Sequence, residues 1–158
     1  MKNKVPTLEQ TIAYASQCHE GQIDKMGQPY IFHPLRVMLM LLTFVDRTVA
    51  MLHDVVEDCD ITFGQLKEQG YPSIITEAVD ALTKRKDEAY DDYLQRVSSN
   101  PVAIRVKKAD LLDNISPVRR YNLAPGHRSR LHAKYTHALE VLRQGELKMA
   151  EDNLECGG

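Results

Sequence analysis

Apolar residues recur every three or four positions along most of the chain, and no run alternates apolar and polar residues over a useful length. The first spacing is typical of helices and the second of strands, so we predict an all-α fold of about eight helices. The helices should form one bundle, with a loop over 116–126. Their expected ranges are 7–19, 33–42, 46–58, 62–70, 72–82, 87–98, 100–115 and 127–144.

Polar residues at the expected helix starts supply cap signals. A capping box pairs a Thr N-cap with a Gln three residues later, and Asn before Pro marks a capped first turn. These signals occur at Thr7 with Gln10, at Thr62 with Gln65 and at Asn100 before Pro101. Asp46 is expected to cap the third helix. The buried stripe of the second helix is expected to comprise Leu35, Met38, Leu39 and Leu42.

The chain has 158 residues, the length of one ordinary domain with a substantial core. We expect one domain over residues 1–144 and a flexible C-terminal tail over residues 145–158. No stretch approaches the roughly 20 apolar residues that span a bilayer, and Met1–Pro6 lacks an apolar signal core, so we expect a cytoplasmic protein with no membrane partner. Cys18, Cys59 and Cys156 have no CxxC spacing and indicate neither a disulfide framework nor a cysteine zinc site.

One stretch, from Leu52 to Asp58, combines an apolar helix pattern with an imidazole and three carboxylates. At about 100° per residue, its four polar residues share one arc of roughly 140° on a single helix. Acids this close repel one another unless a cation lies among them, and imidazole with carboxylate suits several divalent metals. Acids on a helix face also commonly point at water, so this stretch alone leaves both readings open. The four residues are His53, Asp54, Glu57 and Asp58.

The net charge of −2 conceals two regions of opposite sign. Residues 46–60 carry five acids against Arg47, whereas residues 101–135 carry eight basic residues against Asp110 and Asp113. A cation pocket beside a basic wall suits a metal-dependent enzyme that acts on phosphates. The overall charge does not support binding of a nucleic acid polymer. The eight basic residues are Arg105, Lys107, Lys108, Arg119, Arg120, Arg128, Arg130 and Lys134.

Two further residues complete a recognisable ligand order. His33 precedes Pro34, and Asp110 lies in an apolar and basic helix. His, then His-Asp, then Asp on three predicted helices is the ligand order of HD-domain metal-dependent phosphohydrolases. With the Gly27–Pro34 and Lys108–Asn114 segments, the chain resembles the hydrolase domain of RelA/SpoT enzymes, and most closely its small stand-alone relatives, over about residues 7–142.

The resemblance implies an HD-domain helical bundle around one divalent metal, usually Mn²⁺. The implied reaction removes the 3′-pyrophosphate from guanosine 3′,5′-bispyrophosphate (ppGpp), a small phosphorylated nucleotide. Glu57 and Asp58 match the pair that positions or activates the attacking water. The implied metal ligands are His33, His53, Asp54 and Asp110. The expected substrate contacts are Asn114, which the resemblance implies, with Lys25, Tyr93 and Tyr135.

Two departures from the family pattern bear on the substrate. Asp24 stands where an arginine usually holds the guanine, and Leu111 stands where Arg or Lys often follows the Asp ligand. Both remove positive charge from the nucleotide side. The alternatives are therefore an HD phosphohydrolase for another nucleotide or phosphorylated metabolite, and a metal-loaded nucleotide sensor with little turnover. The apolar stripe of the last helix could also serve a homo-oligomer.

Overall fold

The computed structural model describes residues 4–120 and 123–155, apart from the side chains of Val118, Arg120 and Glu155. Arg120 of the expected basic wall therefore lies outside the described side chains. Within these residues the fold is all-α, as predicted, and the only extended pairing is an isolated antiparallel bridge between Ile23 and Pro29. The helices are α1 Leu8–Cys18, α2 Phe32–Leu39, α3 Phe44–Leu52, α4 Val55–Asp58, α5 Phe63–Glu68, α6 Ser73–Leu82, α7 Tyr90–Val97, α8 Pro101–Asn114, α9 Pro117–Arg120 and α10 Pro125–Glu155.

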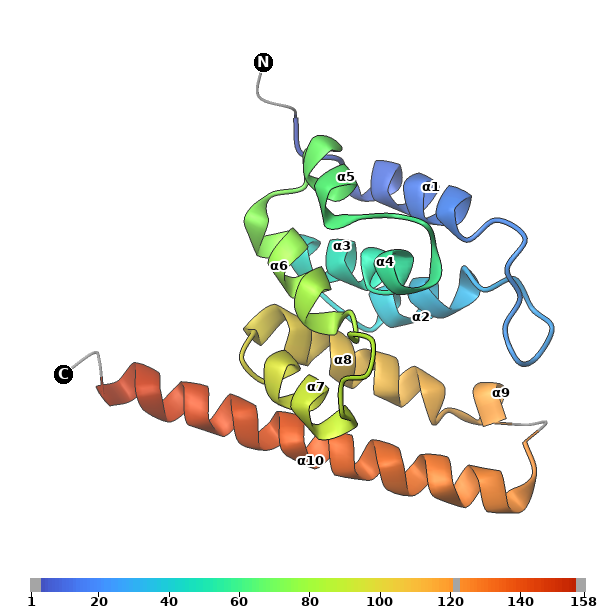
Figure 1. Cartoon of the computed structure of the whole chain (residues 1–158), viewed down its shortest axis with the longest axis vertical. Helices are drawn as coiled ribbons and strands as arrows, with labels where there is room; N and C mark the ends of the chain where they lie inside the picture. Colours follow the sequence, from blue (N-terminus) through green and yellow to red (C-terminus); the bar gives the residue numbers. More distant parts are fainter. Residues whose placement is uncertain (1–3, 121–122, 156–158) are drawn as a thin grey trace.

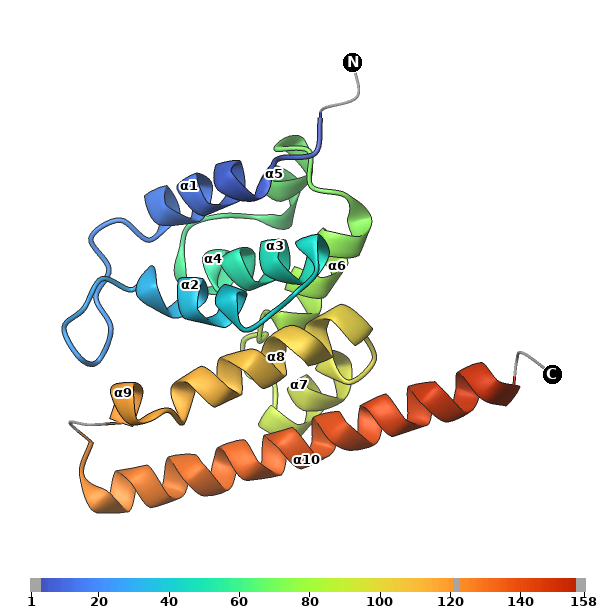
Figure 2. The same ribbon diagram turned by 180° about the vertical axis from the view of Figure 1, so that it is seen from behind.

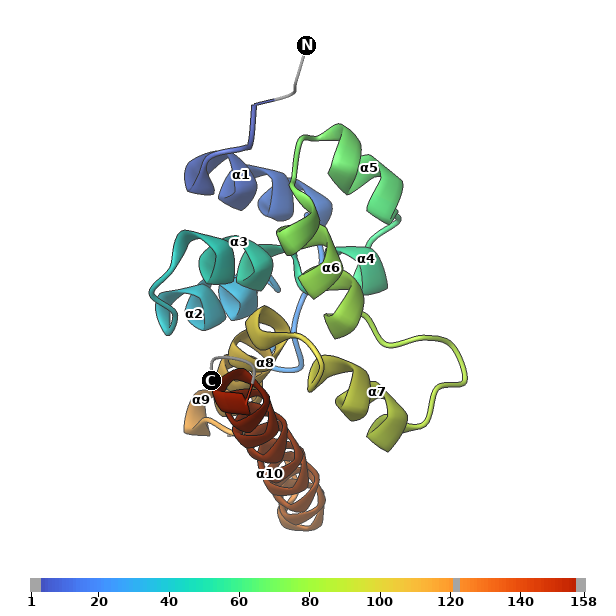
Figure 3. The ribbon, with the colours of Figure 1, turned by 90° about the vertical axis from the view of Figure 1, so that its left-hand side faces the viewer.

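Helix α8 lies in the middle of the molecule. It packs against α2, α3 and α6 on one side and against α7 and α10 on the other. Figures 1 and 2 show α10 running antiparallel to α8 along the opposite side of the molecule from α1 and α5. In Figure 3 the N-terminal helices stand together above the end of α10. Side chains on α8 can therefore meet groups from α2 and the α3–α4 region. No helix of the described residues is long and apolar enough to cross a membrane.

Side-chain caps mark the starts of four of the described helices. Thr7 and Thr62 each form the predicted capping box, and the Asn100 side chain accepts a hydrogen bond from the Ala103 amide. The prediction for Asp46 is wrong, because the Thr43 hydroxyl caps α3. Asp46 is instead buried, and Arg105 of α8 binds both of its carboxylate oxygens.

The second helix buries a different stripe from the one expected. Met38 is buried and Leu35 packs partly against the core, as predicted. Leu39 and Leu42 are 70% and 89% exposed, which contradicts the prediction, while Leu41 is buried. The helix ends at Leu39, so helical spacing no longer decides which residues beyond it face inward.

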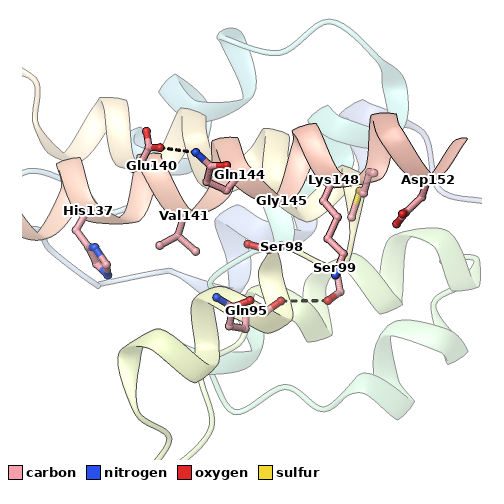
Figure 4. A pocket seen from close by; sticks show the side chains of 11 residues that line it. Gln95, Ser98, Ser99, His137, Glu140, Val141, Gln144, Gly145, Lys148 and Asp152 are labelled. Carbon is pink, nitrogen blue, oxygen red and sulfur yellow. Dashed lines mark hydrogen bonds between the residues drawn. The ribbon is translucent and has the colours of Figure 1, made fainter. Parts of the chain in front are cut away.

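Helix α10 extends past its predicted end. The sequence placed the end near residue 144, but the helix continues through Gly145 to Glu155. A Cβ atom at Gly145 would lie 2.8 Å from the Ser98 Cβ, so the glycine allows α10 to approach the end of α7 closely. Figure 4 shows Gly145 beside Ser98 along a cavity of about 560 Å³ between α10 and the α7–α8 connection. None of the predicted site residues lines this cavity.

Candidate metal centre and active site

The four predicted ligand residues converge in the bundle. The His33 Nε2 in α2 lies 3.1 Å from the Asp110 Oδ1 in α8 and 3.7 Å from the Asp54 Oδ2. The His53 Nε2 lies 3.0 Å from the Asp54 Oδ2 and 3.9 Å from the same Asp110 oxygen. The ligand atoms of His33, His53 and Asp54 all lie within 4.8 Å of one another. A single cation can therefore contact side chains from three separate segments.

The His53-Asp54 pair lies in a break between two helices. The sequence predicted one helix over 46–58, but α3 ends at Leu52 and α4 begins at Val55. The His53 Nδ1 is 2.7 Å from the Ala50 carbonyl oxygen, so the imidazole forms a hydrogen bond with a backbone carbonyl in the last turn of α3. The single helical face that the sequence predicted for His53, Asp54, Glu57 and Asp58 is therefore wrong. The residues still meet because the break is only two residues long.

Outer partners fix the tautomer of both imidazoles. A carbonyl can only accept, so the His53 Nδ1 must carry a proton that it donates to Ala50. The His33 Nδ1 likewise donates to the Asp113 Oδ2 at 2.7 Å, and Arg36 binds both oxygens of that carboxylate. Each histidine then presents the Nε2 lone pair to the centre. The buried His53 Nε2 has no hydrogen-bond partner among the described residues. This donor set fits a divalent metal, since ligating histidines commonly donate their other N–H to such partners.

The carboxylates of the centre are held ionised. Burial raises the pKa of Asp54, but His53 and His33 outweigh it and leave the pKa below its usual range. Burial raises the pKa of Asp110 in the same way, and Lys107 and His33 bring it well below the usual range. The two carboxylates in turn raise the pKa of His53 to about 9, against a lowering by burial. The centre therefore favours a positive charge, either a proton or a metal ion.

Three side chains hold Asp54 and Asp110, the acidic candidate ligands, in place. The Tyr30 hydroxyl donates to the Asp54 Oδ2 at 2.5 Å. The Lys107 Nζ donates to the Asp110 Oδ2 at 2.7 Å, and the Asn114 amide donates to the Asp110 Oδ1 at 2.6 Å. Each contact leaves the carboxylate as an acceptor with a fixed orientation. Asn114 thus touches a candidate ligand residue, and its expected contact with the substrate stays a prediction.

Glu57 and Asp58 are exposed at the edge of the centre, on α4. The Glu57 Oε2 accepts a hydrogen bond from the Lys84 amide at 3.1 Å. Partial desolvation and then the charge of Asp54 raise the pKa of Asp58, and desolvation with the charges of Asp54 and Asp58 raises that of Glu57. A raised carboxyl pKa suits a group that takes up a proton near neutral pH.

Three of the four expected substrate contacts lie together. A small cleft of about 40 Å³ is lined by Lys25, Asn114 and Tyr135, together with Met26, Arg119, Leu123 and Leu131. Tyr93 does not line it. The Tyr93 side chain is buried, and its hydroxyl donates to the Leu82 carbonyl at 2.9 Å, which favours a core role for it.

The two departures from the family pattern have structural explanations. Asp24 is paired, because the Arg119 Nη1 lies 3.5 Å from its Oδ2. Leu111 is fully buried and is part of the hydrophobic core. Part of the expected basic wall is also used within the fold. Lys108 pairs with Glu146 of α10, and Arg105 pairs with Asp46, so neither is free to contact a ligand without losing that pair.

Two contributors to the centre were missed from the sequence. Asp113 had a signal, because it lies in line with the apolar residues Val102, Val106 and Ala109 on the buried face of its helix. A buried carboxylate needs a cationic or donor partner. Tyr30 had no comparable signal, because its contact with Asp54 joins residues 24 positions apart.

No known family model matches the chain. A guanosine-3′,5′-bis(diphosphate) 3′-pyrophosphohydrolase of Vibrio cholerae is 32% identical over 128 residues, which cover 73% of this chain and 18% of that protein. The chain is a homologue of the SpoT/RelA pyrophosphohydrolases. Among these homologues, the bifunctional (p)ppGpp synthase/hydrolase SpoT of Escherichia coli K12 is 28% identical over 143 residues. The enzyme of Aquifex aeolicus is 32% identical over 120 residues, or 68% of this chain and 17% of that protein.

A solved structure has the same fold as this chain. It belongs to work titled "A metazoan ortholog of SpoT hydrolyzes ppGpp and plays a role in starvation responses" and has a TM-score of 0.69 with this chain. The likeness covers 98% of each chain at 24% identity. The chain spans about a fifth of the length of the curated SpoT/RelA relatives that it matches. The comparison therefore concerns one region of those longer proteins.

Proposed function

We propose that this chain is a metal-dependent pyrophosphohydrolase that removes the 3′-pyrophosphate of ppGpp. One observation carries the proposal: the two histidines present their Nε2 atoms to Asp54 and Asp110, directly beside the Glu57-Asp58 pair. The SpoT/RelA homologues named for this reaction support the choice of substrate.

The metal would be held by His33, His53, Asp54 and Asp110, and we propose Mn²⁺. Their mixed nitrogen and oxygen donor set accepts several first-row metals, and the resemblance favours manganese among them. A divalent ion bound there would lower the pKa of a coordinated water and polarise a phosphoryl oxygen.

The protein side chains supply the remaining chemistry. Glu57 or Asp58 takes a proton from the attacking water, since both are exposed beside the ligands and have raised pKa values. The water oxygen forms a bond to phosphorus while the bond between phosphorus and the 3′ oxygen breaks, and the 3′ oxygen takes up the proton from the carboxyl group to become the 3′ hydroxyl of GDP. The products are GDP and pyrophosphate. Lys25 lies at the cleft, where its ammonium can neutralise a phosphate of the substrate.

The deciding experiment is incubation of the purified chain with ppGpp and Mn²⁺, followed by anion-exchange separation of the products. Release of GDP and pyrophosphate, abolished by chelator and by Glu57→Gln, is the expected result. Intact ppGpp with the metal bound would refute this substrate. Screening would then turn to other phosphorylated nucleotides and metabolites, because Asp24 and Leu111 depart from the alarmone-hydrolase pattern. Tight nucleotide binding without turnover would instead indicate a sensor.

A further inference from the structure

Two cationic side chains line the cleft beside the candidate metal ligands, and one acid outside the lining pairs with one of them. Lys25 is exposed and makes no ion pair with another described residue, whereas Arg119 is largely buried, with 15% of its side chain exposed. Asp24 is the acid, and its side chain is 5% exposed. The lining residues alone therefore leave the cleft with an excess of positive charge.

The ion pair between Arg119 and Asp24 is loose compared with others in this molecule. Only the Arg119 Nη1 approaches the Asp24 Oδ2, at 3.5 Å. Arg105 binds both oxygens of Asp46 at 2.8 and 2.9 Å, and the same two-point contact joins Arg36 to Asp113. A guanidinium has five N–H donors, and two-point binding is its strong mode with carboxylates and phosphates. Arg119 thus has donor capacity that Asp24 does not satisfy.

Two other contacts hold the guanidinium in place. The Arg119 Nη2 donates to the Asn114 Oδ1 at 3.0 Å, and the Arg119 Nε lies 3.9 Å from the Asp113 Oδ2. Because Arg119 can only donate and the ionised Asp110 can only accept, the Asn114 amide between them has one possible orientation. The cation is therefore fixed beside the ligand residues before any ligand enters.

We propose that Arg119, with Lys25, binds a phosphate group of the substrate. When the cleft holds no ligand, the Asp24 carboxylate pairs with the Arg119 guanidinium instead. The inference rests on the proposed function for the identity of the substrate, but the anion site itself is a property of the cleft. An entering phosphate competes with the Asp24 carboxylate for the Nη1 edge and gains the two-point contact that Asp24 lacks.

If the phosphate and Asp24 compete for Arg119, substitutions of Arg119 and of Asp24 should have opposite effects on anion binding. Arg119→Gln removes the donor and weakens anion binding. Asp24→Asn removes the competing charge and strengthens anion binding. The asparagine keeps an oxygen for the Met26 and Gln28 amides, which the Asp24 Oδ1 accepts at 2.8 and 3.0 Å, so the loop keeps its conformation. A purely structural ion pair would instead be weakened by both changes.

The test measures binding of inorganic pyrophosphate to the full chain by calorimetry, with Mn²⁺ present throughout. Hydrogen bonds to charged groups are worth about 1.5–3 kcal/mol, so Arg119→Gln should weaken binding about tenfold or more. Arg119→Lys should be intermediate, and Asp24→Asn should tighten binding about threefold or more. Arg143→Gln, on the exposed pair with Glu140 of α10, is the matched control and should change nothing.

The same variants assayed with ppGpp should change KM in the same directions with a smaller effect on kcat. Weaker binding in both Asp24→Asn and Arg119→Gln, or no change in either, would overturn the inference. If wild-type protein leaves ppGpp intact but pyrophosphate binding follows the predicted signs, the proposed substrate is wrong and the anion site stands. Thermal unfolding checks that each variant is folded. If Arg119→Gln does not fold, the test rests on whether Asp24→Asn binds pyrophosphate more tightly or more weakly than the wild type.

Discussion

The Asp113 carboxylate accepts a hydrogen bond from the His33 Nδ1 at 2.7 Å while Arg36 binds both of its oxygens. This arrangement places a charged residue of α8 behind a predicted metal ligand of α2. It connects the stability of the α2–α8 packing to the orientation of the ligand.

Asp113→Ala should therefore weaken metal binding about 10- to 100-fold, the usual effect of losing an outer partner. Asp113→Asn should have a smaller effect, because its amide oxygen can still accept from His33. Calorimetric titration with Mn²⁺ measures both. Asp46→Ala is the matched control, since Asp46 is also a buried aspartate bound by an arginine but lies outside the centre. Equal metal affinity in the wild type and Asp113→Ala would contradict the assigned role.

Asp54→Ala should lose the metal, whereas Glu57→Gln should retain it and lose turnover. Asp54 lies among the ligand atoms, while Glu57 is exposed beside them. Loss of a general base costs about 10²- to 10⁴-fold in rate. Metal analysis of the purified variants, with a ppGpp assay in parallel, separates the two roles. Metal-free Glu57→Gln protein would mean that Glu57 is itself a ligand.

Gly145→Ala should destabilise the fold although alanine favours helices. The new Cβ would meet the Ser98 Cβ at 2.8 Å, and overpacking of this kind costs about 1–3 kcal/mol against a helix gain of about 1 kcal/mol. Thermal unfolding should show a melting point lowered by a few degrees. Gly126→Ala is the control, because nothing lies within 4 Å of its Cβ position in the first turn of α10. A Gly145→Ala protein as stable as Gly126→Ala would show that the contact is easily relieved.

Glu88 should make stability depend on pH in the acid range. Arg96 binds both Glu88 oxygens, at 2.6 and 2.8 Å, and hydrogen bonds from Arg96 and the Arg85 amide lower the pKa of Glu88 to about 2 from an ordinary value of 4.5. Because the folded pKa is the lower one, the contribution is complete above pH 4.5 and is lost as the pH falls toward 2. Urea unfolding of the wild type and Glu88→Gln should therefore differ more at neutral pH than at pH 3. If the free energies of unfolding of the wild type and Glu88→Gln differed equally at both pH values, the lowered pKa of Glu88 would be contradicted.

Local signals in the sequence predicted the fold class and most helix starts. Thr7, Thr62 and Asn100 act through atoms within three residues, so their spacing was sufficient. Gly145 acts through Ser98, 47 positions away, and read alone it resembles a helix end. The break at His53 was also not predicted. The imidazole forms a hydrogen bond with the Ala50 carbonyl, and helix propensities do not include such side-chain contacts.

The candidate ligands were predicted from their order in the sequence, and the structure brings them together. Two of their supporting partners were harder to predict, because Tyr30 and Asp113 acquire their roles only when separate segments pack. Lys107 is different, because it pairs with Asp110 three residues away on the same helix. The described residues form two helices more than the sequence predicted. The third predicted helix divides at His53, and α9 forms in a segment that was expected to be a loop.

The candidate ligands at positions 33, 53, 54 and 110 are brought together only by the folded chain, and this has a thermodynamic consequence for any metal ion that they bind. An ion held there binds the native state and not the unfolded chain, so it shifts the folding equilibrium by mass action. At a free metal concentration 100 times the dissociation constant, the gain is about 2.7 kcal/mol. Metal affinity and unfolding midpoint then measure one linked equilibrium. A core substitution far from the centre lowers the apparent affinity as soon as the unfolded population becomes significant.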